Sequence, residues 1–219
     1  MLKKFVSLVH KSTKRNYLAR VNSVDKSQVA KKAIKWGYDY WDGSRDTGYG
    51  GYYYDGRWKK VAKKLIKNYK LKNNMKVLDV GCGKGFLLHD LKQELPSLNV
   101  YGLDISKYAL QKALPDVRKN CKLGSAEKLP FKSNYFDLVI SINTLHNLYN
   151  YQLVNALREI SRVGKKKSFI CVEAYRNEKE KMNLLYWQLT CRAFFTPKEW
   201  KFLFKENNFN GDFEFIYFS

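Results

Sequence analysis

The pattern of apolar and polar residues divides the chain into two parts. From residue 75 onward, apolar runs of strand length alternate with stretches whose apolar residues recur at helical spacing, as at Leu87, Leu88, Leu91 and Leu95. This alternation is typical of strand–helix–strand units. It predicts an α/β fold with a mostly parallel sheet of six to seven strands and helices on both faces.

The same pattern places the individual elements. Strands are expected at residues 75–80, 99–104, 122–123, 136–142, 168–173 and 212–218. Helices are expected at residues 86–94, 106–114 and 151–163. A further helix should run from the cap at Thr196 to about Asn207, because Pro197 and Glu199 complete a typical helix start. A seventh strand, if present, would come from residues 189–195.

The first 74 residues show a different pattern. Helical stretches at residues 26–36 and 57–69 flank a loop, residues 46–56, that is rich in Gly and Tyr. We interpret residues 1–74 as a helical N-terminal extension that packs over the sheet, and residues 75–219 as the main domain.

Composition restricts the class of protein. No uninterrupted apolar run approaches the ~18 residues of a transmembrane helix. The apolar run before residue 10 is too short for a signal peptide, and Lys11, Lys14 and Arg15 follow it. We therefore expect a cytoplasmic protein. The four cysteines form no CxxC pair and have no histidine cluster beside them, so we expect free thiols and no bound metal.

The positive charge is concentrated at the beginning of the chain. Of the formal net charge of +21, residues 1–76 carry +15 and residues 77–219 carry +6. An anionic partner would explain this excess. The preponderance of Lys over Arg, together with abundant Asn and Tyr, is equally typical of an AT-rich genome, and both interpretations stay open.

The strongest motif is the run VLDVGCGKGF at residues 77–86, where a strand enters a glycine-rich turn and a helix follows. Glycine allows a ligand to approach the backbone closely. A nicotinamide or flavin fingerprint, GxGxxG, would need glycine where Phe86 stands. The spacing GxGxG, with an acid two residues before the first glycine, disfavours a pyrophosphate cofactor.

At this motif the chain resembles the class I S-adenosylmethionine (SAM)-dependent methyltransferases, and the resemblance covers roughly residues 77–172. It implies a Rossmann-like SAM-binding domain at residues 75–219, with SAM as cofactor and S-adenosylhomocysteine as product. The glycine loop would lie along the methionine part of SAM, and Asp79 would reach its ammonium group. The loop positions are Gly81, Cys82, Gly83 and Gly85.

Five further residues extend the resemblance. Asp104 ends the second strand, where a carboxylate can accept hydrogen bonds from both ribose hydroxyls. By resemblance, Ile105 would lie against the adenine, with Ala126 and Glu127 at its edge. Asn143 ends the fourth strand, beside the expected methyl-transfer centre.

Several residues are candidates for acting on the acceptor. His146 follows the fourth strand and could be a general base or merely pack, with Glu173 as the alternative base. Tyr175 and Arg176 follow the fifth strand at the same edge, and Arg176 or Arg192 could hold an acidic substrate.

The Gly/Tyr loop is a candidate lid. It carries Tyr49, Tyr52, Tyr53 and Tyr54, followed by Arg57 and Trp58. Aromatic faces suit a sulfonium cation, and Arg57 would lie near the SAM carboxylate or an anionic substrate. The alternative is that these aromatic residues cover the edge of the core.

The sequence favours a small-molecule acceptor, neutral or anionic, that is methylated on oxygen. It lacks the Pro-Pro motif of base-amine methyltransferases, the cysteine–proline pair of 5-methylcytosine enzymes and any appended RNA-binding module. RNA or protein methylation through the basic N-terminal region is the alternative, and a SAM-binding interaction protein is a third hypothesis. Nothing in the sequence indicates the oligomeric state.

Overall fold

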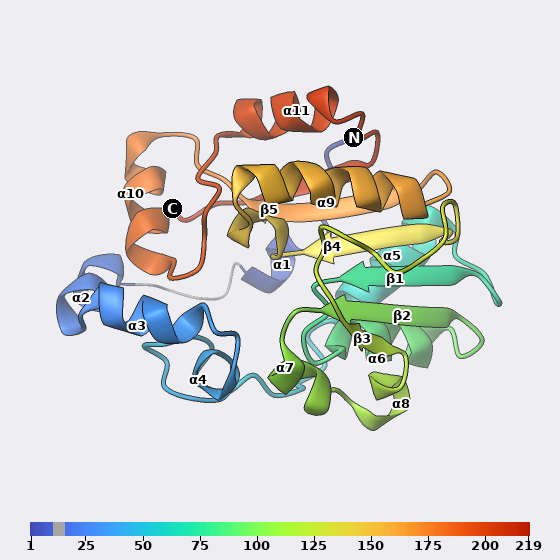
Figure 1. Ribbon diagram of the computed structural model, residues 1–219, viewed down its shortest axis with the longest axis horizontal. Helices are drawn as coiled ribbons and strands as arrows, with labels where there is room; N and C mark the ends of the chain where they lie inside the picture. The colour runs from blue at the N-terminus through green and yellow to red at the C-terminus, as the bar shows by residue number, and fades with distance from the viewer. Residues whose placement is uncertain (11–15) are drawn as a thin grey trace.

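The computed structural model describes residues 1–10 and 16–219, so Lys11, Lys14 and Arg15 lie outside the described residues. The described residues form one six-stranded sheet in the order β3-β2-β1-β4-β5-β6, with every neighbouring pair parallel (Figure 1). The strands are β1 (Lys76–Val80), β2 (Asn99–Asp104), β3 (Cys121–Leu123), β4 (Leu138–Ile142), β5 (Ser168–Glu173) and β6 (Asp212–Ile216). The prediction of a parallel α/β sheet is confirmed.

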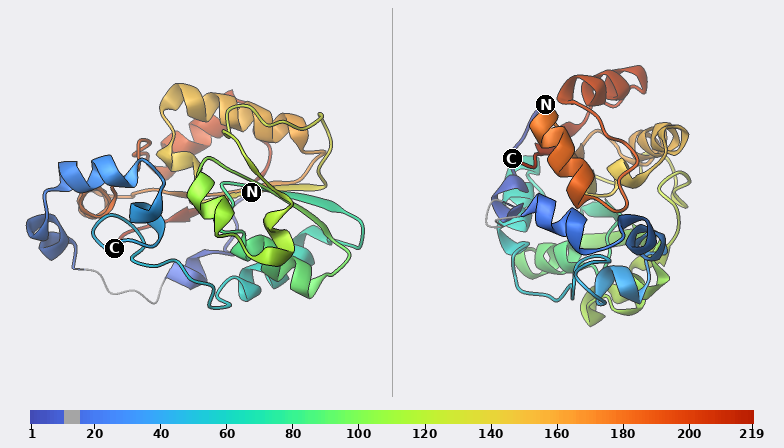
Figure 2. Two further views of the ribbon diagram at one scale, coloured as in Figure 1. Left: turned by 60° about the horizontal axis from the view of Figure 1, so that its bottom comes forward. Right: turned by 90° about the vertical axis from the view of Figure 1, so that its left-hand side faces the viewer.

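Helices cover both faces of the sheet, as Figures 1 and 2 show. The amphipathic helices α9 and α11 pack on one face around Trp200, and α5 and α6 pack on the other around Leu65 and Leu88. The helices are α1 (Ser7–His10), α2 (Tyr17–Ser23), α3 (Lys26–Ala33), α4 (Tyr38–Trp41), α5 (Lys59–Tyr69), α6 (Phe86–Glu94), α7 (Lys107–Gln111), α8 (Pro115–Arg118), the 3-10 turn η1 (Leu145–Asn147), α9 (Asn150–Val163), α10 (Glu178–Trp187) and α11 (Pro197–Glu206).

The elements differ from the sequence prediction mainly at their ends. α3 stops at Ala33, and the backbone turns at Trp36, whose φ is 53°. The helix expected at residues 106–114 is shorter, because α7 ends at Gln111 and a separate short helix, α8, begins at Pro115. β4 begins at Leu138, and the preceding Asp137 instead accepts a hydrogen bond from the Lys76 N–H.

The region after β5 also differs. α10 was not predicted, because its sequence is rich in charge and lacks a clear apolar stripe. Residues 189–195 form no strand. Their backbone turns back toward η1, and the N–H groups of Arg192 and Ala193 donate to the His146 carbonyl at 2.8 and 2.9 Å.

No helix among the described residues has the length and apolarity needed to cross a membrane. In the same part of the chain, no group of His, Cys, Asp and Glu side chains could hold a metal ion. Cys82, Cys121, Cys171 and Cys191 are free thiols. The cytoplasmic location stays a prediction.

The beginning of the chain is fastened to the last strand. Leu2 pairs in parallel with Phe213 of β6. The buried carboxylate of Glu214 then accepts hydrogen bonds from the N–H groups of Phe5, Val6 and Ser7, at 2.5, 2.9 and 2.7 Å. A single side chain therefore satisfies three backbone donors that precede or open α1.

Replacing Glu214 by Gln should lower the free energy of unfolding by about 2–4 kcal/mol, because an amide offers one acceptor oxygen and places its own donors against backbone N–H groups. Urea denaturation measures the change. Glu206→Gln, at an exposed position on α11, is the matched control and should have little effect. Equal stability of the two variants would contradict this role for Glu214.

Candidate active site

The sheet leaves a crevice where its strand order reverses. The chain proceeds from β1 outward to β2 and β3, and then returns to the other side of β1 to form β4. Open parallel sheets bind ligands outside the carboxyl ends of their strands at such a point. A cavity of ≈ 380 Å³ lies there, lined by residues that follow β1, β2, β3 and β4 and by the segment of residues 34–58.

Two positions in the turn between β1 and α6 leave no room for a side chain. Gly81 has a φ of 85°, and a Cβ there would lie 1.9 Å from the Thr144 Oγ1. Gly83 has a φ of 53°, and its Cβ would lie 2.7 Å from the Trp41 ring. Both positions therefore require glycine, and their backbone lines the cavity.

Two buried carboxylates face the same cavity. Asp104 accepts hydrogen bonds from the N–H groups of Gly83 and Ser106, both at 2.7 Å. Burial raises the pKa of Asp104, and these two hydrogen bonds oppose the rise. Burial, together with the nearby charge of Asp104, raises the pKa of Asp79 to about 7. No hydrogen bond from the described residues reaches the Asp79 carboxylate. The site is thus suited to a cationic or hydroxyl-bearing ligand.

The other residues predicted to bind the cofactor also line this cavity, apart from Gly85. Ile105 is 60% exposed there, although it is a large aliphatic side chain. Glu127 is held by Gln152 at 2.9 Å and by Ser125 at 3.2 Å. Ala126 is buried beside them.

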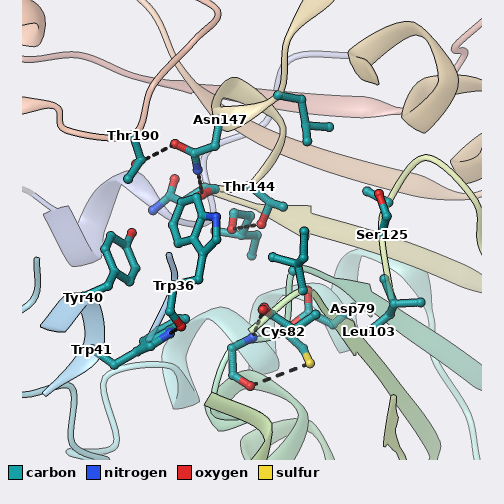
Figure 3. A pocket seen from close by; sticks show the side chains of 18 of the residues that line it. Trp36, Tyr40, Trp41, Asp79, Cys82, Leu103, Ser125, Thr144, Asn147 and Thr190 are labelled. Atoms are coloured by element: carbon teal, nitrogen blue, oxygen red, sulfur yellow. Dashed lines mark hydrogen bonds between the residues drawn. The ribbon is translucent and has the colours of Figure 1, made fainter. Parts of the chain in front are cut away.

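Aromatic side chains form the opposite wall. Figure 3 shows Trp36, Tyr40 and Trp41 on one side of the pocket, facing Asp79 and Cys82 on the other. The Trp41 ring stacks on Tyr49 at 5.5 Å, and the Tyr52 ring stacks on Phe86 at 4.9 Å. We call the segment of residues 34–58 the aromatic cover. Of the predicted lid residues, Tyr49, Tyr52 and Trp58 line this cavity, and the lid itself stays a prediction.

A buried ion pair joins the aromatic cover to the glycine turn. The Lys84 ammonium contacts both oxygens of Asp42, at 2.6 and 2.8 Å, and donates to the Tyr52 carbonyl at 2.8 Å. The Tyr108 hydroxyl also donates to Asp42, at 2.9 Å. Burial alone would raise the pKa of Asp42, but the hydrogen bond from Lys84 leads the contributions that hold it below its usual value.

A second cavity, of ≈ 540 Å³, lies beside the first. Its distinct residues include Arg20, Arg45, His146, Glu173 and Trp187. Six residues line both cavities: Tyr40, Tyr49, Tyr52, Trp58, Asn143 and Thr190. A ligand in each cavity would therefore meet the other at this shared wall.

His146 and Glu173 form a buried pair at the second cavity. The Glu173 N–H donates to the His146 Nδ1 at 3.4 Å, which assigns the ring proton to Nε2, and this atom lies 3.5 Å from the Glu173 carboxylate. Burial lowers the pKa of His146 to about 3. Gln188 donates to the other carboxylate oxygen of Glu173. The ring is therefore neutral, and both of its nitrogens face Glu173.

Four residues predicted at the site line neither cavity: Gly85, Tyr54, Tyr175 and Arg176. Gly85 caps the start of α6 with a φ of 71°. Tyr54 donates to Asp90 at 2.5 Å, and Arg176 forms an ion pair with Glu180. By contrast, Arg57 lines the second cavity, where it forms an ion pair with Asp55 at 2.6 Å, and Arg192 lines the first.

Sequence reasoning missed several residues that line the two cavities. Trp36, Tyr40 and Trp41 form an aromatic cluster only five residues upstream of the predicted lid loop, a signal that could have extended it. Thr144 and Asn147 are within the motif that supplied His146. Arg20 and Arg45 carry no local signal, because their proximity results from tertiary folding.

A family model described as a methyltransferase domain matches residues 71–208. The chain belongs to this methyltransferase family. The matched segment covers well over half of the chain and contains β1 to β5, the glycine turn and both buried carboxylates. The resemblance to class I SAM-dependent methyltransferases is thereby confirmed.

Individual relatives agree with this placement. The methyltransferase is 35% identical over 113 residues to an uncharacterized methyltransferase of Schizosaccharomyces pombe, a match that covers 46% of this chain and 40% of that protein. It is 30% identical over 123 residues to the ribosomal protein L11 methyltransferase of Thermosipho melanesiensis, covering 55% of this chain and 45% of that one. The matched segments thus span less than half the length of these curated relatives.

A solved structure shows the same fold. The YcgJ protein from Bacillus subtilis aligns with a TM-score of 0.54 at 22% identity, covering 67% of this chain and 66% of that chain. At this identity the likeness concerns the fold alone.

The residues of the first cavity fit SAM. A Cβ at Gly81 or Gly83 would collide with Thr144 or Trp41, so the backbone at these two positions is open to a ligand. Asp79 offers a buried carboxylate to an ammonium group, and Asp104 offers its remaining lone pairs to hydroxyls. The aromatic wall suits a sulfonium.

Replacing Asp42 by Asn in this methyltransferase should destabilise it by about 3 kcal/mol, because the buried Lys84 ammonium loses its counter-ion. In the variant, hydrogen exchange should be faster than in wild type at residues 34–58 and little changed in β1. Asp39→Asn, the same substitution at an exposed position of α4, is the control. Unchanged exchange in the aromatic cover would show that the ion pair does not hold it.

The affinity for S-adenosylhomocysteine should fall about tenfold from pH 8 to pH 6, because an ammonium-bearing ligand favours ionised Asp79 and the pKa of Asp79 in the free protein is about 7. Calorimetry at several pH values measures this. Asp79→Asn should bind more weakly at pH 8 and lose most of the pH dependence. A wild-type affinity that does not change between pH 6 and pH 8 would refute the role of Asp79.

Proposed function

We propose that the chain transfers a methyl group from SAM to a small-molecule acceptor in the second cavity, with oxygen of a sugar, acid or secondary metabolite as the acceptor atom. The observation that supports this most directly is the shared wall of two adjoining cavities. The first fits SAM, and the second is lined by a titratable pair, Glu173 and His146.

In this proposal the first cavity holds the cofactor through the residues already described. Asp79 and the backbone of Gly81, Cys82 and Gly83 bind the methionine portion, and Asp104 binds the ribose. Ile105, Ala126 and Glu127 surround the adenine. SAM supplies a methyl group on a positively charged sulfur, and the sulfur leaves as a neutral thioether. The tasks left to the protein are alignment, exclusion of water and removal of one proton.

Glu173 is the better candidate to accept that proton. Both ring nitrogens of His146 face Glu173, and its low pKa makes it a weak base at neutral pH. His146 then acts as a positioning residue that orients the carboxylate, together with Gln188. This reverses the order of preference that the sequence suggested for the two residues.

The aromatic cover favours a small acceptor over a macromolecule. Tyr40, Tyr49, Tyr52 and Trp58 of this cover line both cavities, so a folded RNA or protein would have to reach the transfer point past them. Methylation of RNA or protein stays the alternative. Steep loss of activity with salt on an RNA substrate would support that alternative.

Incubation with tritiated SAM and a metabolite extract should transfer label to a small molecule. Glu173→Gln should lower kcat by about 10² or more, because general-base catalysis contributes that much. Calorimetry should find S-adenosylhomocysteine affinity within about twofold of wild type, since Glu173 lies outside the first cavity. Glu178→Gln, on the exposed start of α10, is the control.

Two results would change the proposal. Label found only in RNA or protein would replace the small-molecule acceptor by the macromolecular one. A larger loss of kcat in His146→Asn than in Glu173→Gln, with the acid limb of the pH–rate profile moved by the His146 change, would assign the base to His146.

A further inference from the structure

We propose that the acceptor carries an anionic oxoacid group, a carboxylate or a phosphate, which Arg20 and Arg45 bind beside Trp187 in the second cavity. This inference rests on the proposed function, because it concerns the substrate of the same site. The three residues line the second cavity but not the first. An acceptor anchored there would extend toward Asn143 and Thr190, which line both cavities.

Backbone carbonyls and a tryptophan ring hold the Arg20 guanidinium in place. Its guanidinium donates to the carbonyls of Arg45 and Asp46, both at 3.1 Å, and lies 4.8 Å from the centroid of the Trp187 ring. Within the described residues it forms no ion pair with a carboxylate. Because a guanidinium has five N–H donors and these two bonds use two of them, donors remain for a ligand.

Arg45 brings a second positive charge to the same ring. Its guanidinium donates to the carbonyls of Gly48 and Tyr49, at 3.1 and 2.9 Å, and lies 5.2 Å from the Trp187 ring centroid. These backbone contacts fix its position within the aromatic cover. Two guanidinium groups thus converge on one tryptophan, although like charges repel each other.

The charge balance of the cavity supports the assignment. Arg57, the third arginine of this cavity, forms an ion pair with Asp55. Glu173, the other acidic residue of the lining, faces His146 and Gln188. Burial lowers the pKa of Arg20, the charge of Arg45 lowers it further, and the charge of Asp46 opposes this shift in part. An anion between the two guanidinium groups would relieve this repulsion.

A planar guanidinium matches the oxygen atoms of a carboxylate or phosphate better than an ammonium does. The bound group serves as an anchor and takes no part in the transfer. The methylated product therefore keeps its negative charge.

The first test observes Trp187 directly. The protein contains five tryptophans, so labelling indole nitrogens with ¹⁵N gives few NMR signals, and Trp187→Phe identifies the relevant one. In protein saturated with S-adenosylhomocysteine, sodium phosphate and sodium acetate are titrated separately. The Trp187 signal should shift to saturation with at least one of them, and the stronger of the two identifies the anion class.

Variants separate binding from structure. Arg20→Gln should weaken the saturating anion about tenfold, since one charged donor pair is lost. Arg20→Lys, which keeps the charge but not the fork, should weaken it less. Arg158→Gln, the same change at an exposed position of α9, should behave as wild type. If Arg20 only holds the backbone at Arg45 and Asp46, Arg20→Gln and Arg158→Gln will bind each anion with the same affinity, and the inference is overturned.

The second test uses turnover. Products labelled in the metabolite extract should be retained on an anion exchanger, and Arg20→Gln should raise KM about tenfold with little change in kcat. Transfer of label to a neutral compound, with KM unaffected by Arg20→Gln, would reject the anionic anchor but leave the proposed methyl transfer standing. Absence of transfer to any extract component would reject the proposed function, and this inference with it.

Discussion

Two positions in the turn between β1 and α6, Gly81 and Gly83, admit no side chain. Gly81 packs against Thr144 of the segment after β4, and Gly83 packs against Trp41 of the aromatic cover. The same two glycines therefore bring together the two halves of the parallel sheet and the N-terminal segment. The cavity that fits SAM lies where these three parts meet, and the Gly83 N–H of the turn donates to the buried Asp104.

The N-terminal segment completes the site instead of merely shielding it. Lys84 follows the second glycine of the turn, and its ammonium is neutralised by Asp42 of the aromatic cover. The rings around Asp42 then supply one wall of the first cavity and most of the wall shared with the second. In physical terms, the glycine turn positions the cofactor atoms, while the aromatic cover determines what can reach them.

The sequence was sufficient for the main domain because periodicity and glycine spacing are local signals. Residues 86–94, 99–104 and 168–173 were placed at the bounds that the structure has. The capping box at Thr196 was found from four neighbouring residues and is present. The Lys84–Asp42 pair, the two arginines beside Trp187 and the three bonds to Glu214 join residues far apart in sequence. Such contacts depend on the tertiary fold, and one sequence does not reveal them.

The shared wall has a thermodynamic consequence. Four of its six side chains belong to the aromatic cover, and each of them contacts both cavities. A molecule that fills either cavity must restrict the motion of these rings, so the entropic cost of ordering them is met by whichever molecule arrives first. Occupancy of the two cavities is consequently linked, and linkage requires that each ligand change the affinity of the other by the same factor.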